Sequence, residues 1–384
     1  MISMERSLLG ENVGTGDSVQ RHRDYGQSVA QLDIIVLTKK GYQTKQLADN
    51  VFCYPTNSFS KLFYFSKAKK IARRIFARDN YDLVVCQDPF LTGLVGYFIK
   101  RKFKTKLLIH FHGDFWQNKY WLKENILNYP LLLISKLTIK RADALRVVSP
   151  AIKKKLTASG IPAALIKVIP TPVNLGKIKS TDNQTISSIK QQFSGKKIIL
   201  WVGRLSPEKN LPWFLEVLKK VISQYPDLVF LIAGKGREFN LINTTRVKLG
   251  IADYVKLLGS VNYKELVNYY HAADIFVLPS LHESFGKVLL EAAVAAKPVV
   301  ASATTGAKEI IQDKKTGYLV PINNQKQFTD KLLNLLTNEN LAQQMGAAAF
   351  KHVQQEYNYH SNIQAIISFW KQIIGHLRFQ DHQI

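Results

Sequence analysis

Residues 278–300 read LPSLHESFGKVLLEAAVAAKPVV, and this stretch indicates how the chain folds. An apolar run ends at Ser280, a short polar loop follows, and a second apolar run begins at Pro298. Between them, apolar residues recur at intervals of three and four, which predicts a helix that begins near Ser284. These residues are Phe285, Val288, Leu289 and Ala292. A strand, a helix and a second strand in this order are typical of a parallel α/β sheet.

The same alternation of short apolar runs with longer helical stretches continues along the chain. The runs are rich in β-branched residues and almost continuously apolar, as expected of parallel strands that are covered on both faces. They are LDIIVLT (32–38), DLVVCQ (82–87), KLLIHFH (106–112), ALRVVS (144–149), KIILWVG (197–203), LVFLIAG (228–234), DIFVLPS (274–280) and PVVASA (298–303). We therefore predict an α/β protein with doubly wound sheets.

The length of 384 residues exceeds what one hydrophobic core usually organises, so we expect two domains. Between the fourth and fifth apolar runs lies VIPTPVNLGKIKSTDNQTISS (168–188), which we interpret as the hinge region because it is rich in Pro, Ser and Thr. This interpretation places the first domain at residues 1–175 and the second at 176–358.

The composition is that of a globular protein with a strong positive charge. Hydrophobic residues make up 46% of the chain and charged residues 21%, and the formal net charge is +25. The first 175 residues are the more basic part, with 28 Lys and Arg against 12 Asp and Glu. Such a charge favours an anionic partner, which can be a nucleic acid, anionic lipid headgroups or a phosphorylated substrate.

The sequence predicts a cytoplasmic location. No apolar run approaches the roughly 20 residues that span a bilayer, and the start of the chain lacks the pattern of a signal peptide. Cys53 and Cys86 form neither a metal-ligand spacing nor a disulfide framework, which agrees with a reducing compartment.

Doubly wound sheets bind ligands at the carboxyl ends of their strands, so the residues that follow the apolar runs are site candidates. Arg204 and Lys209 follow KIILWVG and flank the start of a predicted helix, LPWFLEVLKKV, for which Asn210 is the expected N-cap. A helix N-terminus already attracts anions, so two cations beside it suit a diphosphate. The alternative is a pair of solvated loop cations.

Glu283 and Glu291 are the carboxylates of the opening stretch. Glu283 precedes the predicted helix, where a carboxylate can accept hydrogen bonds from sugar hydroxyls, and Glu291 lies two turns further on, off the apolar face. Gly286 leaves the backbone accessible, so N–H groups near Lys287 can meet phosphate or hydroxyl oxygens. The alternative is an N-cap carboxylate together with an ordinary surface pair of Lys287 and Glu291.

Five segments, in their order and spacing, resemble the donor-binding domain of the family 4 glycosyltransferases, which are retaining enzymes of the GT-B fold. They are GRLSPEKN (203–210), LIAGKG (231–236), LLGSV (257–261), ADIFVLPSLHESFGKVLLEAAVAAKPVV (273–300) and TTGAKEIIQDKKTGYLV (304–320). The resemblance implies two doubly wound, Rossmann-like domains that face a central cleft, with a final helix in 359–384 that crosses back to the first domain. The chain departs from the family pattern at Ala296, where the family usually has Gly, and in the hinge at Thr171 to Asn174.

The resemblance also implies roles for the candidate residues. Arg204 and Lys209 would neutralise the diphosphate of a nucleotide-sugar donor, Glu283 would hold the donor sugar, and Glu291 would bind the nucleotide ribose. The implied donor site further includes Gly203, Gly234, Phe285, Gly286, Val288 and Leu289.

The first domain contributes weaker candidates. Gly14 and Gly16 resemble a glycine-rich loop near the donor phosphate, although an ordinary flexible loop is the alternative. In HFHGDF (110–115), His110 and His112 share one face of a strand, yet no third ligand is spaced for a metal. The resemblance places His112 beside the donor sugar and Asp114 near the acceptor.

The resulting prediction is a retaining, metal-independent glycosyltransferase that needs no cofactor and moves a sugar to a carbohydrate or lipid-linked acceptor. The basic segment KLFYFSKAKKIARRIFAR (61–78) predicts an amphipathic helix, which either lies on an anionic membrane surface at the inner face of the cell membrane or packs on its own sheet. Two other functions stay open at this point. A GT-B sugar-nucleotide epimerase would share the diphosphate site, and a nucleic-acid binder would explain the charge, although no nucleic-acid-binding motif is present and no nucleic acid is expected.

Overall fold

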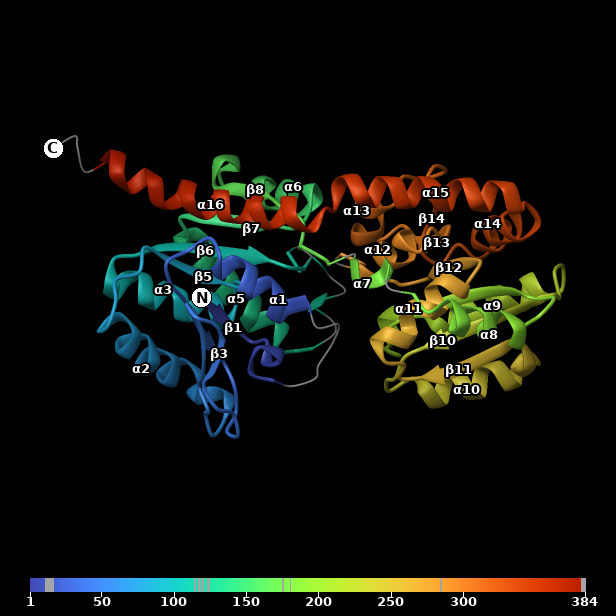
Figure 1. Cartoon of the computed structure of the whole chain (residues 1–384), viewed down its shortest axis with the longest axis horizontal. Helices are drawn as coiled ribbons and strands as arrows, with labels where there is room; N and C mark the ends of the chain where they lie inside the picture. The colour runs from blue at the N-terminus through green and yellow to red at the C-terminus, as the bar shows by residue number, and fades with distance from the viewer. Residues whose placement is uncertain are drawn as a thin grey trace. The chain divides into compact units, whose positions relative to one another are not determined.

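The computed structural model describes residues 1–10, 17–113, 115–116, 118, 121–122, 125–174, 176–179, 181–283 and 285–380. The chain divides into two compact units, which Figure 1 shows in blue to green with red, and in green to orange. The first unit comprises Met1–Pro172 together with Tyr359–Ile384, and the second comprises Val173–Asn358. The division thus falls inside the Pro-rich hinge segment, and the last helix belongs to the first unit.

The first unit is built on an eight-stranded sheet in the order β3-β4-β2-β1-β5-β6-β7-β8. Its strands are β1 (Ile2–Ser3), β2 (Leu32–Val36), β3 (Lys45–Ala48), β4 (Val51–Pro55), β5 (Leu83–Cys86), β6 (Lys106–Phe111), β7 (Ala144–Val147) and β8 (Ile166–Val168). All pairs are parallel except β3 with β4. The two-residue β1 is central, because it pairs with β2 on one side and β5 on the other.

Helices cover both faces of this sheet, because successive strand residues point to opposite sides. α1 (Asp17–Gly26) and α16 (Tyr359–Gln380) pack on one face, where the Tyr25 and Trp370 rings lie 5.0 Å apart and the Tyr359 hydroxyl donates to Asp24 at 2.5 Å. The other face is covered by α2 (Tyr64–Phe76), α3 (Leu91–Phe103), α5 (Asn128–Arg141) and α6 (Pro150–Ala158).

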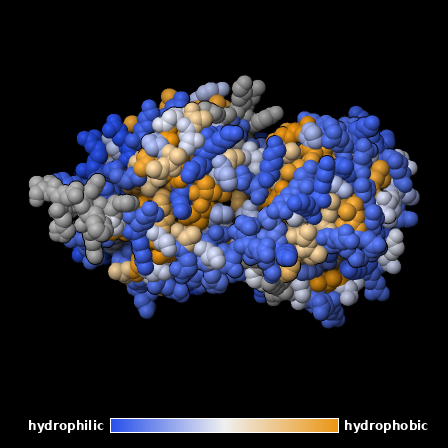
Figure 2. Space-filling view, turned by 90° about the horizontal axis from the view of Figure 1, so that it is seen from above, coloured by the Kyte–Doolittle hydropathy of each residue, from blue (hydrophilic) through white to orange (hydrophobic). Residues whose placement is uncertain are grey.

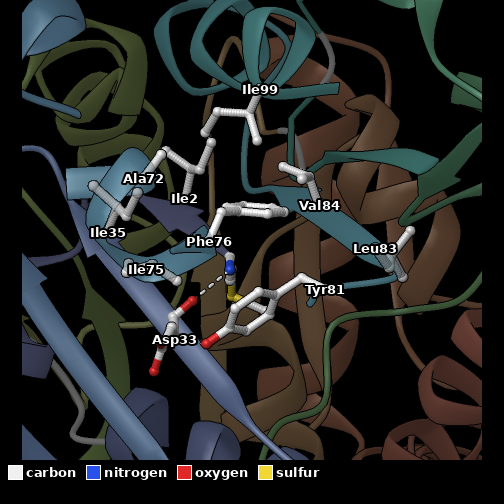
Figure 3. Close-up of a pocket in the computed structure, with 11 residues that line it drawn as sticks. Ile2, Asp33, Ile35, Ala72, Ile75, Phe76, Tyr81, Leu83, Val84 and Ile99 are labelled. Carbon is white, nitrogen blue, oxygen red and sulfur yellow. Dashed lines mark hydrogen bonds between the residues drawn. The ribbon is translucent and has the colours of Figure 1, made fainter. Parts of the chain in front are cut away.

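The apolar stripe of α2 is part of the core of the first unit. Ala68, Ala72 and Ile75 are buried, and Figure 3 shows Ala72, Ile75 and Phe76 lining a small pocket together with Ile2 of the sheet. Of the two interpretations of segment 61–78, packing on its own sheet is therefore the correct one for the stripe. The expectation that this stripe lies on a bilayer is wrong, because the sheet already covers it.

The second unit is built on a six-stranded parallel sheet in the order β11-β10-β9-β12-β13-β14. Its strands are β9 (Lys197–Val202), β10 (Leu228–Ala233), β11 (Val255–Gly259), β12 (Ile275–Leu278), β13 (Val299–Ser302) and β14 (Tyr318–Val320). Within this unit, the first strand, β9, lies in the middle of the sheet. The chain then adds β10 and β11 on one side of β9, and β12 to β14 on the other. The strand order therefore reverses between β9 and β12.

Helices enclose this second sheet as well, and its central side chains are fully buried, among them Trp201, Phe230 and Phe276. The helices are α7 (Gly176–Lys179), α8 (Asn183–Gln192), α9 (Leu211–Ile222), α10 (Phe239–Lys248), α11 (Tyr263–Ala272), α12 (Lys287–Val294), α13 (Thr305–Ile310), α14 (Gln325–Thr337) and α15 (Glu339–Glu356).

The surface is largely polar. On the face that Figure 2 shows, hydrophilic side chains surround smaller apolar patches. None of the described helices is both long and apolar enough to cross a membrane.

Candidate functional site

The loop that follows β9 carries the two predicted diphosphate ligands. Arg204 is exposed, and its Nη2 lies 3.9 Å from Glu208 Oε1. Lys209 ends a short 3-10 helix, Pro207–Lys209, immediately before α9. Asn210 occupies the N-cap position as expected, but it has a left-handed backbone with φ 59° and its side chain donates to the Pro279 carbonyl at 3.3 Å instead of capping the helix.

The loop that follows β12 brings Glu283 to Lys209. Lys209 Nζ donates to Glu283 Oε1 at 2.5 Å, and the Ser280 hydroxyl donates to the same oxygen at 3.0 Å. Both side chains of the ion pair are mostly shielded, with 18% of Lys209 and 11% of Glu283 exposed. Because this contact is charge-assisted and partly desolvated, it fixes the two groups relative to each other more firmly than a surface pair would.

Backbone hydrogen bonds hold the neighbouring loops around this pair. The Leu281 N–H donates to the Glu208 carbonyl, and the Gly306 N–H donates to the Glu283 carbonyl, each at 2.8 Å. The loops that follow β9, β12 and β13 are thereby joined at one edge of the sheet. This edge is the carboxyl end of the strands at the point where the strand order reverses, which is where doubly wound sheets bind their ligands.

The helix of the opening stretch starts later than the sequence indicated. α12 begins at Lys287, and Gly286 before it has a left-handed φ of 79°, which a residue with a side chain adopts only with strain. Leu289 is 1% exposed, and its N–H already donates to the Gly286 carbonyl at 2.8 Å. Among the predicted donor-site positions, Phe285 and Val288 are half-buried, whereas Leu289 belongs to the core.

Glu291 lies inside the unit and not on its surface. It is 2% exposed, it accepts a hydrogen bond from the Tyr270 hydroxyl at 2.8 Å, and it lies 3.7 Å from Lys287 Nζ. Burial, and then the adjacent Glu291 carboxylate, raise the pKa of Tyr270 well above its ordinary value, so the phenol stays protonated and donates. α12 is buried on more than one side, so Glu291 is buried although its position lies off the apolar stripe. The alternative of an ordinary surface pair with Lys287 is therefore wrong, although the pair itself is present.

Two further glycines are required by close backbone contacts beside the same edge. A Cβ atom on Gly234 would lie 1.7 Å from the Gly203 carbonyl oxygen, and one on Gly236 would lie 2.1 Å from that of Leu205. The loops after β9 and β10 therefore touch through their backbones. Gly203 and Gly234 were predicted from the sequence, but Gly236 was not. Ser280 was not predicted either, because no motif distinguishes it from an ordinary loop serine.

The first unit places His112 just after β6, where its side chain is exposed. His112 Nε2 lies 2.8 Å from the Gln87 side-chain oxygen, and its Nδ1 lies 3.4 Å from the Thr171 hydroxyl. An Nε2–H that donates to Gln87 leaves Nδ1 as the acceptor for Thr171, which describes one neutral tautomer. Gln87 and Thr171 were not predicted, because they are distant from His112 in the sequence.

His110 has a different environment from His112, although the two rings are 5.6 Å apart. It is 1% exposed, and its Nδ1 lies 3.4 Å from Nη1 of the buried Arg146. Burial, and then the charge of Arg146, lower the pKa of His110 well below its ordinary value. Arg146 also donates to the carbonyls of Ile169 at 3.1 Å and Pro170 at 2.7 Å, so this cluster anchors the start of the hinge segment.

Three of the predicted positions cannot be placed. Gly14, Gly16 and Asp114 lie outside the described residues. Within the described part of the chain, no group of three or more His, Cys, Asp or Glu side chains is arranged to hold a metal ion.

Comparison with known proteins follows the same division of the chain. Residues 29–177 match the model of Glycosyltransferase Family 4, and residues 182–352 match that of Glycosyl transferases group 1. An alpha-monoglucosyldiacylglycerol synthase of Streptococcus pneumoniae is 26% identical over 66% of this chain and 58% of its own length. The matched part covers 43% of the length of a 2-deoxystreptamine N-acetyl-D-glucosaminyltransferase of Niallia circulans and 83% of that of a glycosyltransferase of Methanocaldococcus jannaschii.

Two solved structures share the fold over almost the whole chain. A sucrose-phosphate synthase of Thermosynechococcus elongatus superposes with a TM-score of 0.82 at 19% identity and covers 98% of both chains. The Anabaena protein HepE, solved in complex with UDP and glucose, superposes with a TM-score of 0.77 at 18% identity, over 97% of this chain and 99% of its own.

The two doubly wound units, with an ion pair at the strand reversal of the second, therefore define a protein of the GT-B fold. The chain belongs to the GT-B glycosyltransferases of the family 4 type, as the resemblance of its five segments implied.

Proposed function

We propose that this protein is a retaining, metal-independent glycosyltransferase, which moves a sugar from a nucleotide-diphosphate sugar to a hydroxyl of a lipid-linked or polysaccharide precursor. The observation that supports it most is the contact between Lys209 and Glu283 at the strand reversal of the second unit. Glycosyltransferase activity itself follows from the family, whereas the stereochemistry, the metal independence and the acceptor are part of the proposal.

In the proposed reaction, the bond between sugar C1 and the diphosphate oxygen breaks as the acceptor oxygen bonds to C1 on the same face. The leaving phosphate takes the proton of the acceptor hydroxyl, so no enzyme carboxylate has to act as a nucleophile. Negative charge grows on the diphosphate, and the cations Arg204 and Lys209 stabilise it. Glu283, held in place by Lys209 and Ser280, accepts hydrogen bonds from the donor sugar.

Two residues have more distant roles in this proposal. Glu291 binds the nucleotide ribose, and its link to Tyr270 keeps the carboxylate in one orientation. His112, held by Gln87 and Thr171, contributes from the first unit beside the donor sugar.

The proposed acceptor is supported by the charge of the chain and by the name of one relative. The strong positive charge suits a precursor that carries phosphate or lies among anionic lipids. One relative is named as a synthase of a glucosylated diacylglycerol, which is a membrane lipid. We propose that this chain works as a peripheral protein at the inner face of the cell membrane.

A transfer assay tests the proposal. The full chain is incubated with UDP-, GDP- and ADP-sugars and with lipid or polysaccharide acceptors, and nucleoside diphosphate release and the anomeric configuration of the product are measured. We expect one donor to be consumed in the presence of acceptor and EDTA, with retained configuration, and Glu283→Ala and Lys209→Ala to abolish transfer without unfolding. An inverted product would contradict the retaining stereochemistry, and loss of activity in EDTA would contradict the metal independence. Full turnover by either variant would contradict the roles given to Lys209 and Glu283. Conversion of the nucleotide sugar without any acceptor would favour an epimerase instead.

A further inference from the structure

Four helices that cover one face of the first unit contain no carboxylate. α2 carries five Lys and Arg residues, and α3, α5 and α6 carry three each, while none of the four, all described in full, contains Asp or Glu. In the second unit, α9, α11, α14 and α15 each contain at least one acidic residue, and α8 and α10, which contain none, carry only one and two Lys or Arg residues. Positive charge is therefore concentrated on one layer of helices and is not spread evenly over the chain.

The same layer exposes large apolar side chains. Of the fourteen large hydrophobic residues that are exposed in the described structure, eight lie in two of its segments, 59–63 and 126–137. On and just before α5, the exposed fractions are 82% for Ile126, 66% for Leu133 and 44% for Leu137, and Leu127 and Tyr129 are more than half exposed. We refer to Ile126, Leu127, Tyr129, Leu133 and Leu137, with the exposed Lys136 and Lys140 beside them, as the α5 surface.

A hollow beside α5 combines apolar and cationic groups. It has a volume of about 410 Å³, and its lining includes Trp116, Leu132 and Ile161 with Lys136 and Lys140. The indole N–H of Trp116 donates to the Ser159 hydroxyl at 2.7 Å, so the rest of the ring can serve as an apolar wall. An apolar lining beside two ammonium groups suits a molecule with an anionic head and a hydrocarbon tail.

These observations distinguish between the anionic partners that the net charge allows. Proteins bind nucleic acids through cations and through aromatic side chains that stack on bases, whereas four of the five exposed apolar side chains of the α5 surface, all except Tyr129, are aliphatic and cannot stack. Aliphatic side chains next to cations instead suit the interface of a bilayer. There the aliphatic side chains enter the acyl region, and each Lys or Arg attracts anionic headgroups.

We propose that the α5 surface docks the first unit on a bilayer that contains anionic lipids, with a lipid phosphate held by Lys136 and Lys140. This inference rests on the proposed membrane-linked acceptor, but it assigns the contact to α5 and not to the apolar stripe of α2, which is buried. Docking there would bring the first unit to the membrane that supplies its acceptor.

Co-sedimentation of the full chain with vesicles tests this proposal. Vesicles of phosphatidylcholine alone are compared with vesicles that also contain phosphatidylglycerol, at low and at high salt. We expect the wild type to sediment with the anionic vesicles at low salt and to bind them less at high salt. Replacing both Lys136 and Lys140 by Ala is expected to lower the partition coefficient by about thirty-fold, and Leu133→Ser with Leu137→Ser by at least about ten-fold.

Matched variants on the second unit serve as controls. Leu241→Ser with Val247→Ser removes two comparably exposed apolar side chains from α10, and Lys219→Ala with Lys248→Ala removes two exposed lysines. We expect both control pairs to bind vesicles like the wild type. Equal losses in control and α5 variants, or no loss in either α5 pair, would overturn the assignment.

Other occupants of the α5 surface would be recognised in the same series. If the wild type does not bind vesicles but binds nucleic acid, and this binding depends on the two lysines and not on Leu133 and Leu137, the proposal is overturned in favour of a nucleic acid. A dimer in solution that dissociates in the leucine variants would assign the surface to a second copy of the chain. Donor hydrolysis measured without membranes separates this inference from the proposed function. The α5 variants are expected to hydrolyse the donor like the wild type but to bind vesicles less.

Discussion

Ala296 holds a left-handed backbone conformation, with φ 54°, between α12 and β13. A residue with a side chain is disfavoured there by roughly 1–2 kcal/mol, whereas glycine is not. We therefore expect Ala296→Gly to raise the free energy of unfolding by about 1 kcal/mol, as measured by urea denaturation. Ala347→Gly, at an exposed position inside α15, is the control and is expected to lower it by about 1 kcal/mol. A loss of stability in Ala296→Gly would contradict this explanation.

His22 makes the first unit sensitive to acid. It is 1% exposed, and burial, with a further contribution from Arg21, lowers its pKa from 6.5 to about 4. Between these two values the unfolded chain binds a proton that the folded chain does not, so the free energy of unfolding falls as the pH falls through this window, by up to about 3 kcal/mol. Urea denaturation at pH 7 and pH 5 should show a smaller pH effect in His22→Gln than in the wild type. The exposed His360→Gln serves as the control, and an unchanged pH effect in His22→Gln would refute the assignment.

The residues of the candidate site were predictable where a motif fixes their spacing. Lys209 and Glu283 were named from the sequence, and the structure brings them together. Ser280, Gln87 and Thr171 were missed, because their contacts depend on which strands are neighbours and not on local pattern. The burial of Glu291 was not predicted, since the helical period identifies an apolar face but not a buried polar contact such as that with Tyr270.

At the scale of elements, the loops after β9 and β10 depend on the absence of a side chain at Gly234. Its substitution by Ala would place a methyl group 1.7 Å from the Gly203 carbonyl oxygen, so the two loops must separate. We expect Gly234→Ala to lower the free energy of unfolding by about 3 kcal/mol and to remove donor binding. Gly250→Ala, where a Cβ meets no atom within 4 Å, should cost only the strain of its positive φ and leave donor binding intact. Normal donor binding by Gly234→Ala would contradict the role given to this contact.

The strands that are buried on both faces followed from their patterns, whereas the very short or partly exposed strands did not. All eight predicted apolar runs contain strands, because strands buried on both faces are continuously apolar. The central β1 has only two residues, which is too short for a recognisable apolar run. The edge strands β3 and β11 are partly exposed, so their sequences are not continuously apolar. The order of the strands in each sheet could likewise not be predicted from the sequence pattern, because it is decided by tertiary packing.

At the scale of the whole molecule, each unit has its own sheet and its own core, and the chain passes between them at Pro172 and again before Tyr359. The α16 helix returns to the first unit and packs on α1 through Trp370 and Tyr25. The second unit supplies the proposed ligands of the diphosphate and the ribose, Arg204, Lys209 and Glu291, so donor binding can be tested without an acceptor.

The most direct test is the affinity of the full chain for nucleotide sugars, measured by calorimetry after a thermal-shift survey has selected the donor. The account predicts that Lys209→Ala lowers this affinity by about 100-fold, because a shielded cation is lost from the diphosphate, while Lys219→Ala on α9 leaves it unchanged. Wild-type affinity in Lys209→Ala, with the fold intact, would show that the donor does not bind at the reversal of strand order between β9 and β12.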